Sequence, residues 1–278
     1  MAVVFESKVM DLNFCEGVGY LTFKDFKKYS FLNHCYSTRL GGISDGFYRS
    51  MNLCFSVGDD LENVLKNYRI FCKALDFDFK NLVTTEQIHE DNIAVISKIS
   101  HTEKGSGVCK IPNSDGLITN VPGIVLNTFH ADCDVLFLID PIKKVVGLAH
   151  AGWRGTVKKI CSKLVNIAKV RYGCNEKNII CALGPSILKC CFEVSKDILP
   201  YFDKLKIEKT YIHNADVDGK VYIDLHDVNK QLLINAGVSQ KNIIIADVCT
   251  KCNKDILFSH RAMGVYRGGN SAFISIKK

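Results

Sequence analysis

The sequence has no long hydrophobic run, although 47% of its 278 residues are hydrophobic. No uninterrupted apolar stretch reaches the roughly 18 residues that a membrane-spanning helix needs. The N-terminal residues Met1–Lys8 also lack the basic, apolar and small-residue segments of a secretion signal. We therefore expect a soluble, cytoplasmic protein with a substantial buried core.

The chain also lacks internal repeats, low-complexity segments and any linker rich in proline and serine. Its length is within the normal range for one α/β or mixed domain. We therefore predict a single domain that spans residues 1–278.

Positive charge is present without being concentrated. The net charge of +7 comes from Lys and Arg scattered along the whole chain, with no basic block or basic tail. Such a distribution permits attraction to anionic or phosphate-bearing ligands. It favours nucleic acid only weakly, so a nucleic-acid-binding protein without enzymatic activity is the least favoured class.

Cysteine is abundant, with 13 residues. The odd number, the chain length and the lack of a secretion signal argue against a disulfide framework and favour reduced, buried thiols. The segment Cys249–Cys252 is a C-x-x-C pair, but a zinc ribbon needs a second pair at suitable spacing, and Cys190-Cys191 does not have it. We expect structural thiols at all four positions.

Apolar periodicity predicts three helices and a larger number of strands. One helix follows Asp59-Asp60, with Asp59 and Glu62 as a capping-box-like pair; one runs from Val157 to a stop at Gly173; and one runs from Asp224 to Gly237. The predicted strands are Val18–Phe23, His34–Thr38, Asn92–Ser97, Ile124–Phe129, Val135–Ile139, Val145–His150, Ile179–Leu183, Ile243–Val248 and Ala272–Ile276.

The order of these elements predicts hairpins near Asp132 and near 141–144, followed by helical crossovers. Antiparallel hairpins and crossovers together favour a mixed-sheet α/β domain over a wholly parallel sheet.

The segment His150-Ala151-Gly152-Trp153-Arg154-Gly155-Thr156 stands at the junction between a predicted strand and a predicted helix, and contains the only tryptophan. A strand end holds a side chain rigidly, and a helix start offers unpaired N–H groups to an anion. We therefore expect a functional site at this junction, with Trp153 packed beneath the helix or stacked on a ligand.

Three segments carry a potential metal ligand at a strand edge or turn, and they contain His89, Cys133 and His150. Two imidazoles and one thiolate suit zinc, and three protein ligands leave a fourth position for water or substrate. His130 competes for the ligand role, although strand alternation places it on the opposite face from Cys133. Taken singly, each histidine is also compatible with an ordinary hydrogen-bonded residue, and Cys133 with a buried thiol.

A set of motifs resembles the YfiH-like laccase-domain family, in the family's order from about residue 35 to the end. The motifs are Ser37–Ser44, Met51-Asn52-Leu53, Gln87-Ile88-His89, Ser114–Thr119, Ala131-Asp132-Cys133, His150–Thr156, Gly184–Ile187, Phe192-Glu193-Val194 and Phe258–Arg261. The resemblance implies a mixed α/β fold with an internally duplicated β-rich unit. It also implies a cytoplasmic enzyme, a monomer or homodimer, that holds zinc, or copper, through His89, Cys133 and His150.

The activity implied by the resemblance is purine nucleoside phosphorylase, with adenosine deaminase and methylthioadenosine phosphorylase activities, in a family first named for polyphenol oxidation. A multicopper oxidase needs many histidines, and this chain has eight, without His-x-His pairs. Phosphorolysis instead needs anion donors, which Arg39, Arg154 and Arg261 can supply. Arg267 is an alternative to Arg261.

Deamination would require a carboxylate that moves protons beside a zinc-activated water. Asp115 and Glu193 are the candidates, although Asp115 also fits a turn before Gly116 and Glu193 a helix start or an exposed position. A different enzyme class, a cysteine hydrolase, would use Cys133 as nucleophile and His150 or His89 as base.

Overall fold

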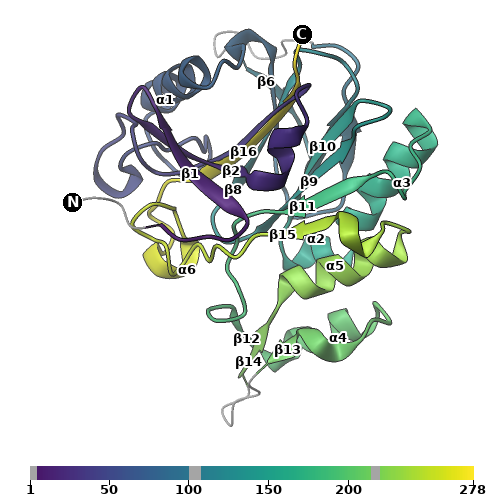
Figure 1. Ribbon diagram of the computed structural model, residues 1–278. Helices are drawn as coiled ribbons and strands as arrows, with labels where there is room; N and C mark the ends of the chain where they lie inside the picture. The colour runs from purple at the N-terminus through teal and green to yellow at the C-terminus, as the bar shows by residue number, and fades with distance from the viewer. Residues whose placement is uncertain (1–4, 100–107, 214–219) are drawn as a thin grey trace.

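The structure is a computed structural model that describes residues 5–99, 108–213 and 220–278 (Figure 1). The described residues form three β-sheets. The first sheet has the spatial order β1 (Met10–Cys15), β2 (Val18–Phe23), β3 (Leu32–Ser37), β16 (Asn270–Ile276), β8 (Val125–His130), β4 (Leu82–Thr85) and β6 (Cys109–Ile111). The second has the order β15 (Ile243–Ile245), β11 (Ile180–Leu183), β9 (Asp134–Asp140), β10 (Val145–Ala151), β7 (Gly116–Thr119) and β5 (Ile93–Val95).

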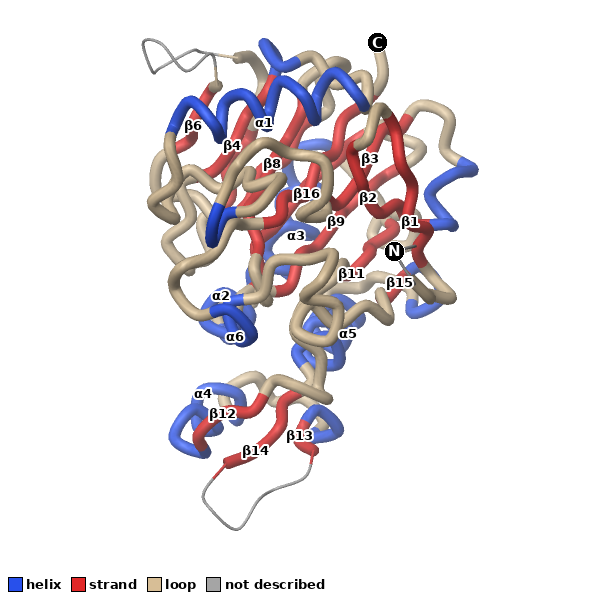
Figure 2. Tube along the Cα trace, turned by 90° about the vertical axis from the view of Figure 1, so that its left-hand side faces the viewer, coloured by secondary structure: helices blue, strands red, loops and turns tan. Residues whose placement is uncertain are grey.

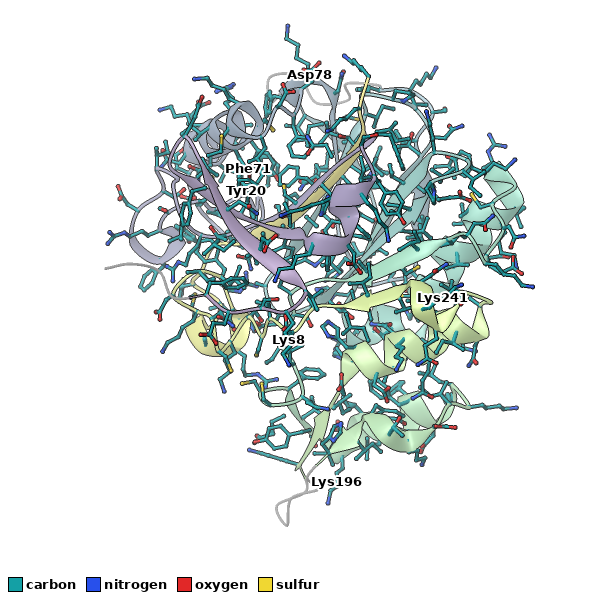
Figure 3. All side chains as sticks on the ribbon, viewed as in Figure 1. Lys8, Tyr20, Phe71, Asp78, Lys196 and Lys241 are labelled. Carbon is teal, nitrogen blue, oxygen red and sulfur yellow. The ribbon has the colours of Figure 1, made fainter. Side chains whose placement is uncertain are left out.

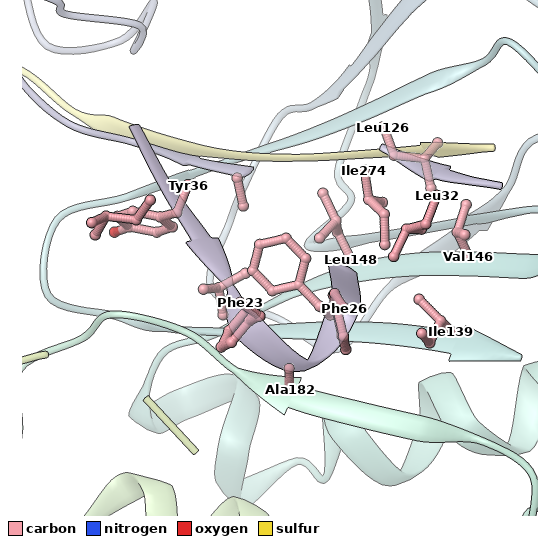
Figure 4. Packing of buried hydrophobic residues seen from close by; sticks show 14 of the residues in the cluster. Phe23, Phe26, Leu32, Tyr36, Leu126, Ile139, Val146, Leu148, Ala182 and Ile274 are labelled. Carbon is pink, nitrogen blue, oxygen red and sulfur yellow. The ribbon is translucent and has the colours of Figure 1, made fainter. Parts of the chain in front are cut away.

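The first and second sheets pack face to face and enclose the central core. This core combines Phe23, Tyr36, Leu126 and Ile274 of the first sheet with Ile139, Val146, Leu148 and Ala182 of the second (Figure 4). Each residue of β9 is buried, because alternate side chains enter the central core and a second cluster on the other face of the sheet. A strand buried on both faces is hydrophobic almost throughout, as the run Val135–Ile139 is.

The described residues also form six α-helices. They are α1 (Leu61–Ala74), α2 (Trp153–Val157), α3 (Ile160–Tyr172), α4 (Leu199–Asp203), α5 (Leu225–Asn235) and α6 (His260–Met263). Helix α1 lies against the first sheet, whereas α3 and α5 lie on the other side of the molecule, by the second sheet (Figure 1). The result is a mixed α/β arrangement of four layers.

A small third sheet lies apart from the two large ones, in the order β12 (Glu193–Ser195), β14 (Lys220–Ile223) and β13 (Ile212–His213), with α4 beside it (Figure 2). Its own apolar cluster joins it to the start of α5 through Ile223, Leu225 and Val228. Trp153 packs partly buried against this cluster, with its ring 5.7 Å from that of Tyr201, so packing is its role in the fold.

All nine predicted strands are present, with ends shifted by a few residues. The first and third predicted helices are confirmed as α1 and α5, although the N-cap of α1 is Asp60, whose carboxylate accepts from the backbone N–H of Glu62, and not Asp59. The helix predicted over 157–173 is broken. Lys159, with φ of 64°, separates α2 from α3.

The hairpin predicted near Asp132 is wrong. Strand β8 pairs with β16 and β4 in the first sheet, whereas β9 pairs with β10 and β11 in the second. The chain therefore crosses from one sheet to the other at residues 131–133. The hairpin predicted around 141–144 is confirmed by the antiparallel pairing of β9 with β10.

Charged side chains are distributed over the outside, with Asp78 at one end of the molecule and Lys196 at the other (Figure 3). Each of the thirteen cysteines is a free thiol. Among the described residues, no helix is long and apolar enough to span a membrane.

Candidate active site

Three predicted ligands, from segments far apart in sequence, meet at one place. His89 lies in the loop after β4, Cys133 in the crossing between β8 and β9, and His150 near the end of β10. Their ligand atoms lie within 4.8 Å of one another. His89 is exposed, Cys133 is half-buried and His150 is buried. The three donor atoms thus converge at a place that solvent can reach from the side of His89.

Asp115 holds two of these ligands in position. Its carboxylate accepts hydrogen bonds from the backbone N–H groups of Ile88, His89 and Glu90 at 3.1, 3.0 and 2.9 Å. A fourth bond, of 2.8 Å, joins it to Nδ1 of His150. Because Nδ1 is engaged with a carboxylate, Nε2 is the nitrogen of His150 available to a metal.

The same contacts set the charge of Asp115. Burial would raise its pKa, but the hydrogen bond from His150 and the backbone N–H groups lower it below its usual value. Asp115 is therefore an anion with both oxygens already occupied. These contacts hold the segments of His89 and His150 in place, and the proton transfer predicted for Asp115 stays a prediction.

Cys133 and His150 shift each other's pKa. Burial would raise the pKa of Cys133, but the neighbouring His150 and His89 lower it to about 6. Burial would lower the pKa of His150, but Cys133 and Asp115 raise it to about 9. Cys133 is thus a thiolate near neutral pH, which is the form that binds metals.

Gly152 leaves the space between the three ligands open. A Cβ atom at this position would lie 3.0 Å from Cys133 Sγ, 3.2 Å from His89 Nδ1 and 3.6 Å from His150 Cε1. A methyl group there would occupy the volume that the donors surround. Two nitrogens, one thiolate and this open volume fit a borderline-soft ion such as zinc.

A cavity of about 380 Å³ adjoins the three ligands. Phe55 and Phe129 contribute apolar surface to it, while Lys110, His260 and Arg267 contribute cationic or titratable groups. The arrangement can hold an aromatic group and an anion next to a metal. The sequence does not single out Lys110, which belongs to no recognisable motif, or His260, which lies inside the motif Phe258–Arg261 next to the predicted Arg261. It predicts Arg267 only as an alternative to Arg261.

Residues 33–277 match the model of the family described as multi-copper polyphenol oxidoreductase laccase. The chain belongs to this family. It is 33% identical over 243 residues to purine nucleoside phosphorylase YlmD of Geobacillus stearothermophilus, covering 86% of this chain and 88% of that one.

Adenosine deaminase RL5, from an unknown prokaryotic organism, is 34% identical over 238 residues, which are 84% of this chain and 90% of the relative. The crystal structure of the hypothetical protein YfiH of Bacillus licheniformis superposes with a TM-score of 0.88 at 27% identity, covering 96% of this chain and 99% of that one. The curated relatives are named as enzymes, and this member of the laccase family is an enzyme. The predicted YfiH-like resemblance and mixed α/β fold are confirmed.

The structure does not bring the predicted arginines of this family member into the cavity. The guanidinium of Arg39 donates to the carbonyls of Arg49 and Lys254, at 2.7 and 3.0 Å for its closest bonds. The guanidinium of Arg154 lies 4.4 Å from the ring centre of Trp153. Both side chains are directed to contacts outside the cavity lining.

Arg261 and Glu193 contact each other at the small third sheet. Arg261 donates from Nη1 to the carbonyl of Glu193 at 2.8 Å. The carboxylate of Glu193 pairs with Lys220 at 2.8 Å and accepts from the hydroxyl of Tyr222. Neither residue lines the cavity, because Glu193 lies in β12 of the third sheet and the side chain of Arg261, from α6, reaches toward it.

His130 does reach the site. Its ring centre lies 5.5 Å from that of His150, and its Nε2 shares a hydrogen bond of 2.8 Å with the hydroxyl of Thr128. The prediction from strand alternation fails here, because residues 131–133 are not part of a strand. Burial, with His150 nearby, keeps the pKa of His130 well below its usual value, so it lines the cavity as a neutral ring.

Proposed function

We propose that this enzyme is a purine nucleoside phosphorylase. It cleaves adenosine, inosine or S-methyl-5'-thioadenosine with phosphate and releases the free base and ribose 1-phosphate or its methylthio form. The observation that carries the proposal is the cavity in which His89, Cys133 and His150 stand beside cationic and aromatic side chains. The names of YlmD and of RL5 support the same substrate class.

Lys110 and Arg267 are the proposed phosphate donors, in place of Arg39, Arg154 and Arg261. Arg267 has five N–H groups, of which the described contacts use two, one to His260 at 3.4 Å and one to the carbonyl of Gly268 at 2.9 Å. The ammonium group of Lys110 lies 3.5 Å from the carboxylate of Glu86. This pair is partly exposed and therefore weak, so an anion can displace it.

The reaction needs the phosphate oxygen to attack C1' of the ribose while the bond from C1' to the purine nitrogen breaks. The purine leaves with the electron pair of that bond and takes up a proton. Phe55 and Phe129 supply apolar rings on which a purine can stack. The amide of Gln87 fixes Phe129 by bonds to its backbone N–H and carbonyl. Orientation of the two reactants in a confined site lowers the entropic part of the barrier.

His89, Cys133 and His150 are the residues proposed to hold the metal, and zinc is the proposed ion because it accepts both nitrogen and sulfur donors. When bound, zinc would supply Lewis-acid chemistry at the open position. For an adenosine deaminase side activity, Glu86 is the carboxylate of the cavity lining and replaces Asp115 and Glu193 as the proposed proton carrier. We place the enzyme in the cytoplasm, where a chain with thirteen thiols stays reduced.

The cysteine hydrolase remains the second candidate, and the lowered pKa of Cys133 beside His150 favours it. Alkylation of Cys133 in metal-free protein separates the two functions. A hydrolase loses activity on alkylation and keeps it in chelator, whereas the proposed phosphorylase loses activity with its metal. Multicopper oxidation is not favoured, because the described residues offer two metal-ligand clusters, one with two histidines and one with none.

The test is a nucleoside panel assayed for base release with and without phosphate. We expect release only with phosphate and none from Cys133→Ala. Arg267→Gln should raise the KM for phosphate roughly 10–100-fold, the effect of one lost charge-assisted hydrogen bond. Arg171→Gln, at an exposed helix end, is the matched control and should behave as wild type. Base release that ignores phosphate would overturn the proposal.

A further inference from the structure

Four cysteine sulfurs outside the active site form a compact cluster. Cys190 and Cys191 lie in the loop between β11 and β12, and Cys249 and Cys252 lie in the loop between β15 and α6. All four sulfurs lie within 4.8 Å of one another. The fold thus pairs the C-x-x-C segment with two adjacent cysteines, a partner that spacing along the sequence did not suggest.

The distances within this cluster match those of a tetrahedral metal site. Cys190 and Cys191 have sulfurs 3.7 Å apart, and the sulfur of Cys252 lies 3.9 Å from the first and 3.5 Å from the second. Four thiolates around zinc, with bonds of about 2.3 Å, stand about 3.8 Å apart. A disulfide would need sulfurs about 2.05 Å apart, so these are four separate thiols.

The backbone around Cys249 offers donors to its sulfur. The N–H groups of Leu188 and Cys252 donate to the sulfur of Cys249. The turn that presents Cys249 and Cys252 is closed by Asn253, whose backbone N–H and side-chain amide both donate to the carbonyl of Cys249, at 3.0 and 2.8 Å.

We propose that Cys190, Cys191, Cys249 and Cys252 form a closed tetrathiolate site for a structural zinc ion. Four protein ligands leave no open position, which distinguishes this site from the three-ligand active site. The guanidinium of Arg261 contacts the carbonyl of Cys191 at 3.4 Å and brings positive charge to a site whose four thiolates outweigh the ion's charge.

The ion would join two loops that both contact the segment carrying Cys133. Ile187, in the first loop, donates from its backbone N–H to the carbonyl of Asp132 at 2.8 Å. Thr250, in the second, donates from its hydroxyl to the carboxylate of Asp132. Asp132 directly precedes the ligand Cys133, and the second loop continues to His260 of the cavity lining. The tetrathiolate site would therefore fix both sides of the segment that presents Cys133.

Metal analysis of the purified full chain tests this site independently of nucleoside turnover. We expect two zinc ions per chain. Cys252→Ser, at an exposed position, should lose one ion and keep the other, whereas His89→Ala should lose only the active-site ion. Cys15→Ser is the matched control, because Cys15 belongs to neither cluster, and it should keep both. An unchanged zinc content in Cys252→Ser would overturn the proposal.

The visible spectrum of bound cobalt is a second measurement of the tetrathiolate site. It uses two different cysteine variants, so the test does not depend on the folding of one of them. In His89→Ala, cobalt should give the tetrahedral visible bands and strong sulfur-to-metal charge transfer of a four-thiolate site. Adding either Cys252→Ser or Cys190→Ser to this variant should remove both signals. Absence of the signals from His89→Ala, or a non-reduced mass lower by two hydrogens that shows a disulfide among these cysteines, would refute the zinc site.

Discussion

Replacement of Asp115 by Asn tests how the fold prepares the active site. In the structure, each oxygen of Asp115 accepts two hydrogen bonds, from His89 and His150 at Oδ1 and from Ile88 and Glu90 at Oδ2. Asparagine keeps one oxygen and puts an NH₂ group in place of the other. Two donors, of which at most that of His150 is fully buried, would then face a further donor, and the negative charge beside His150 would be gone.

The expected magnitude follows from these contacts. Leaving a buried donor without its acceptor costs about 1–3 kcal/mol, so two donors that are mostly part-buried, at the low end of this range, should lower the free energy of unfolding of the metal-free protein by about 2 kcal/mol. Loss of the partner of a metal-binding histidine typically lowers metal affinity 10–100-fold. We expect Asp115→Asn to show both effects, because Asp115 orients His150 and the loop of His89 together.

Chelator competition measures the zinc affinity, and urea unfolding of the metal-free protein measures stability. Asp91→Asn is the matched control, since Asp91 makes a partly exposed pair with Lys163 at 3.1 Å and does not contact a ligand. It should change neither quantity by more than about 1 kcal/mol. Zinc affinity in Asp115→Asn equal to that of the control would refute the reasoning that Asp115 positions the metal ligands.

Two further predictions concern a glycine and a buried histidine. Gly152→Ala should abolish zinc binding at the active site while the far-ultraviolet circular dichroism stays native, since its Cβ would lie 3.0 Å from Cys133 Sγ; full zinc content would contradict this. His34, whose Nε2 accepts from the N–H of Phe23, has a pKa lowered by burial from 6.5 to about 3, so the fold keeps it neutral. Its contribution to stability is therefore complete above pH 6.5 and declines as the pH falls toward 3, by about 2 kcal/mol at pH 5. His34→Gln should remove this part of the pH dependence in urea unfolding, and parallel profiles would count against it.

Local patterns predicted the parts of the fold that local forces determine. Helix α1 has a capping aspartate and a regular apolar face, and the strand over Val135–Ile139 is a continuous buried run, so both were predictable. The pairing of the strands was less predictable. Two β-rich runs separated by a short polar segment suggested a hairpin at Asp132, but β8 pairs instead with β16, which is remote in sequence.

The candidate site shows the same division. His89, Cys133 and His150 were predicted because the chemistry of a metal restricts the residue types that can bind it. Arg39 and Arg261 were predicted for phosphate by residue type, and Arg154 also by its place at a predicted helix start, but the direction of a long side chain depends on tertiary contacts that no local motif encodes. Tertiary packing likewise explains why Lys110 and Arg267 line the cavity. Only the packing of β6 and of the segment after α6 brings these two side chains there.

Asp132 shows how the crossing between the sheets and the site depend on each other. Its φ of 91° lies in a region that costs a non-glycine residue about 1–3 kcal/mol. Its carboxylate accepts from the hydroxyl of Thr250 and from the backbone N–H of Arg261, bonds worth about 1.5–3 kcal/mol each when the acceptor is charged. Asp132→Gly would relieve the backbone strain but lose both hydrogen bonds. Because the two bonds together contribute more than the strain costs, the net effect should be destabilising. We expect lower stability and weaker zinc binding at Cys133 by urea unfolding and chelator competition, and a more stable variant with unchanged affinity would show that backbone strain outweighs the two hydrogen bonds.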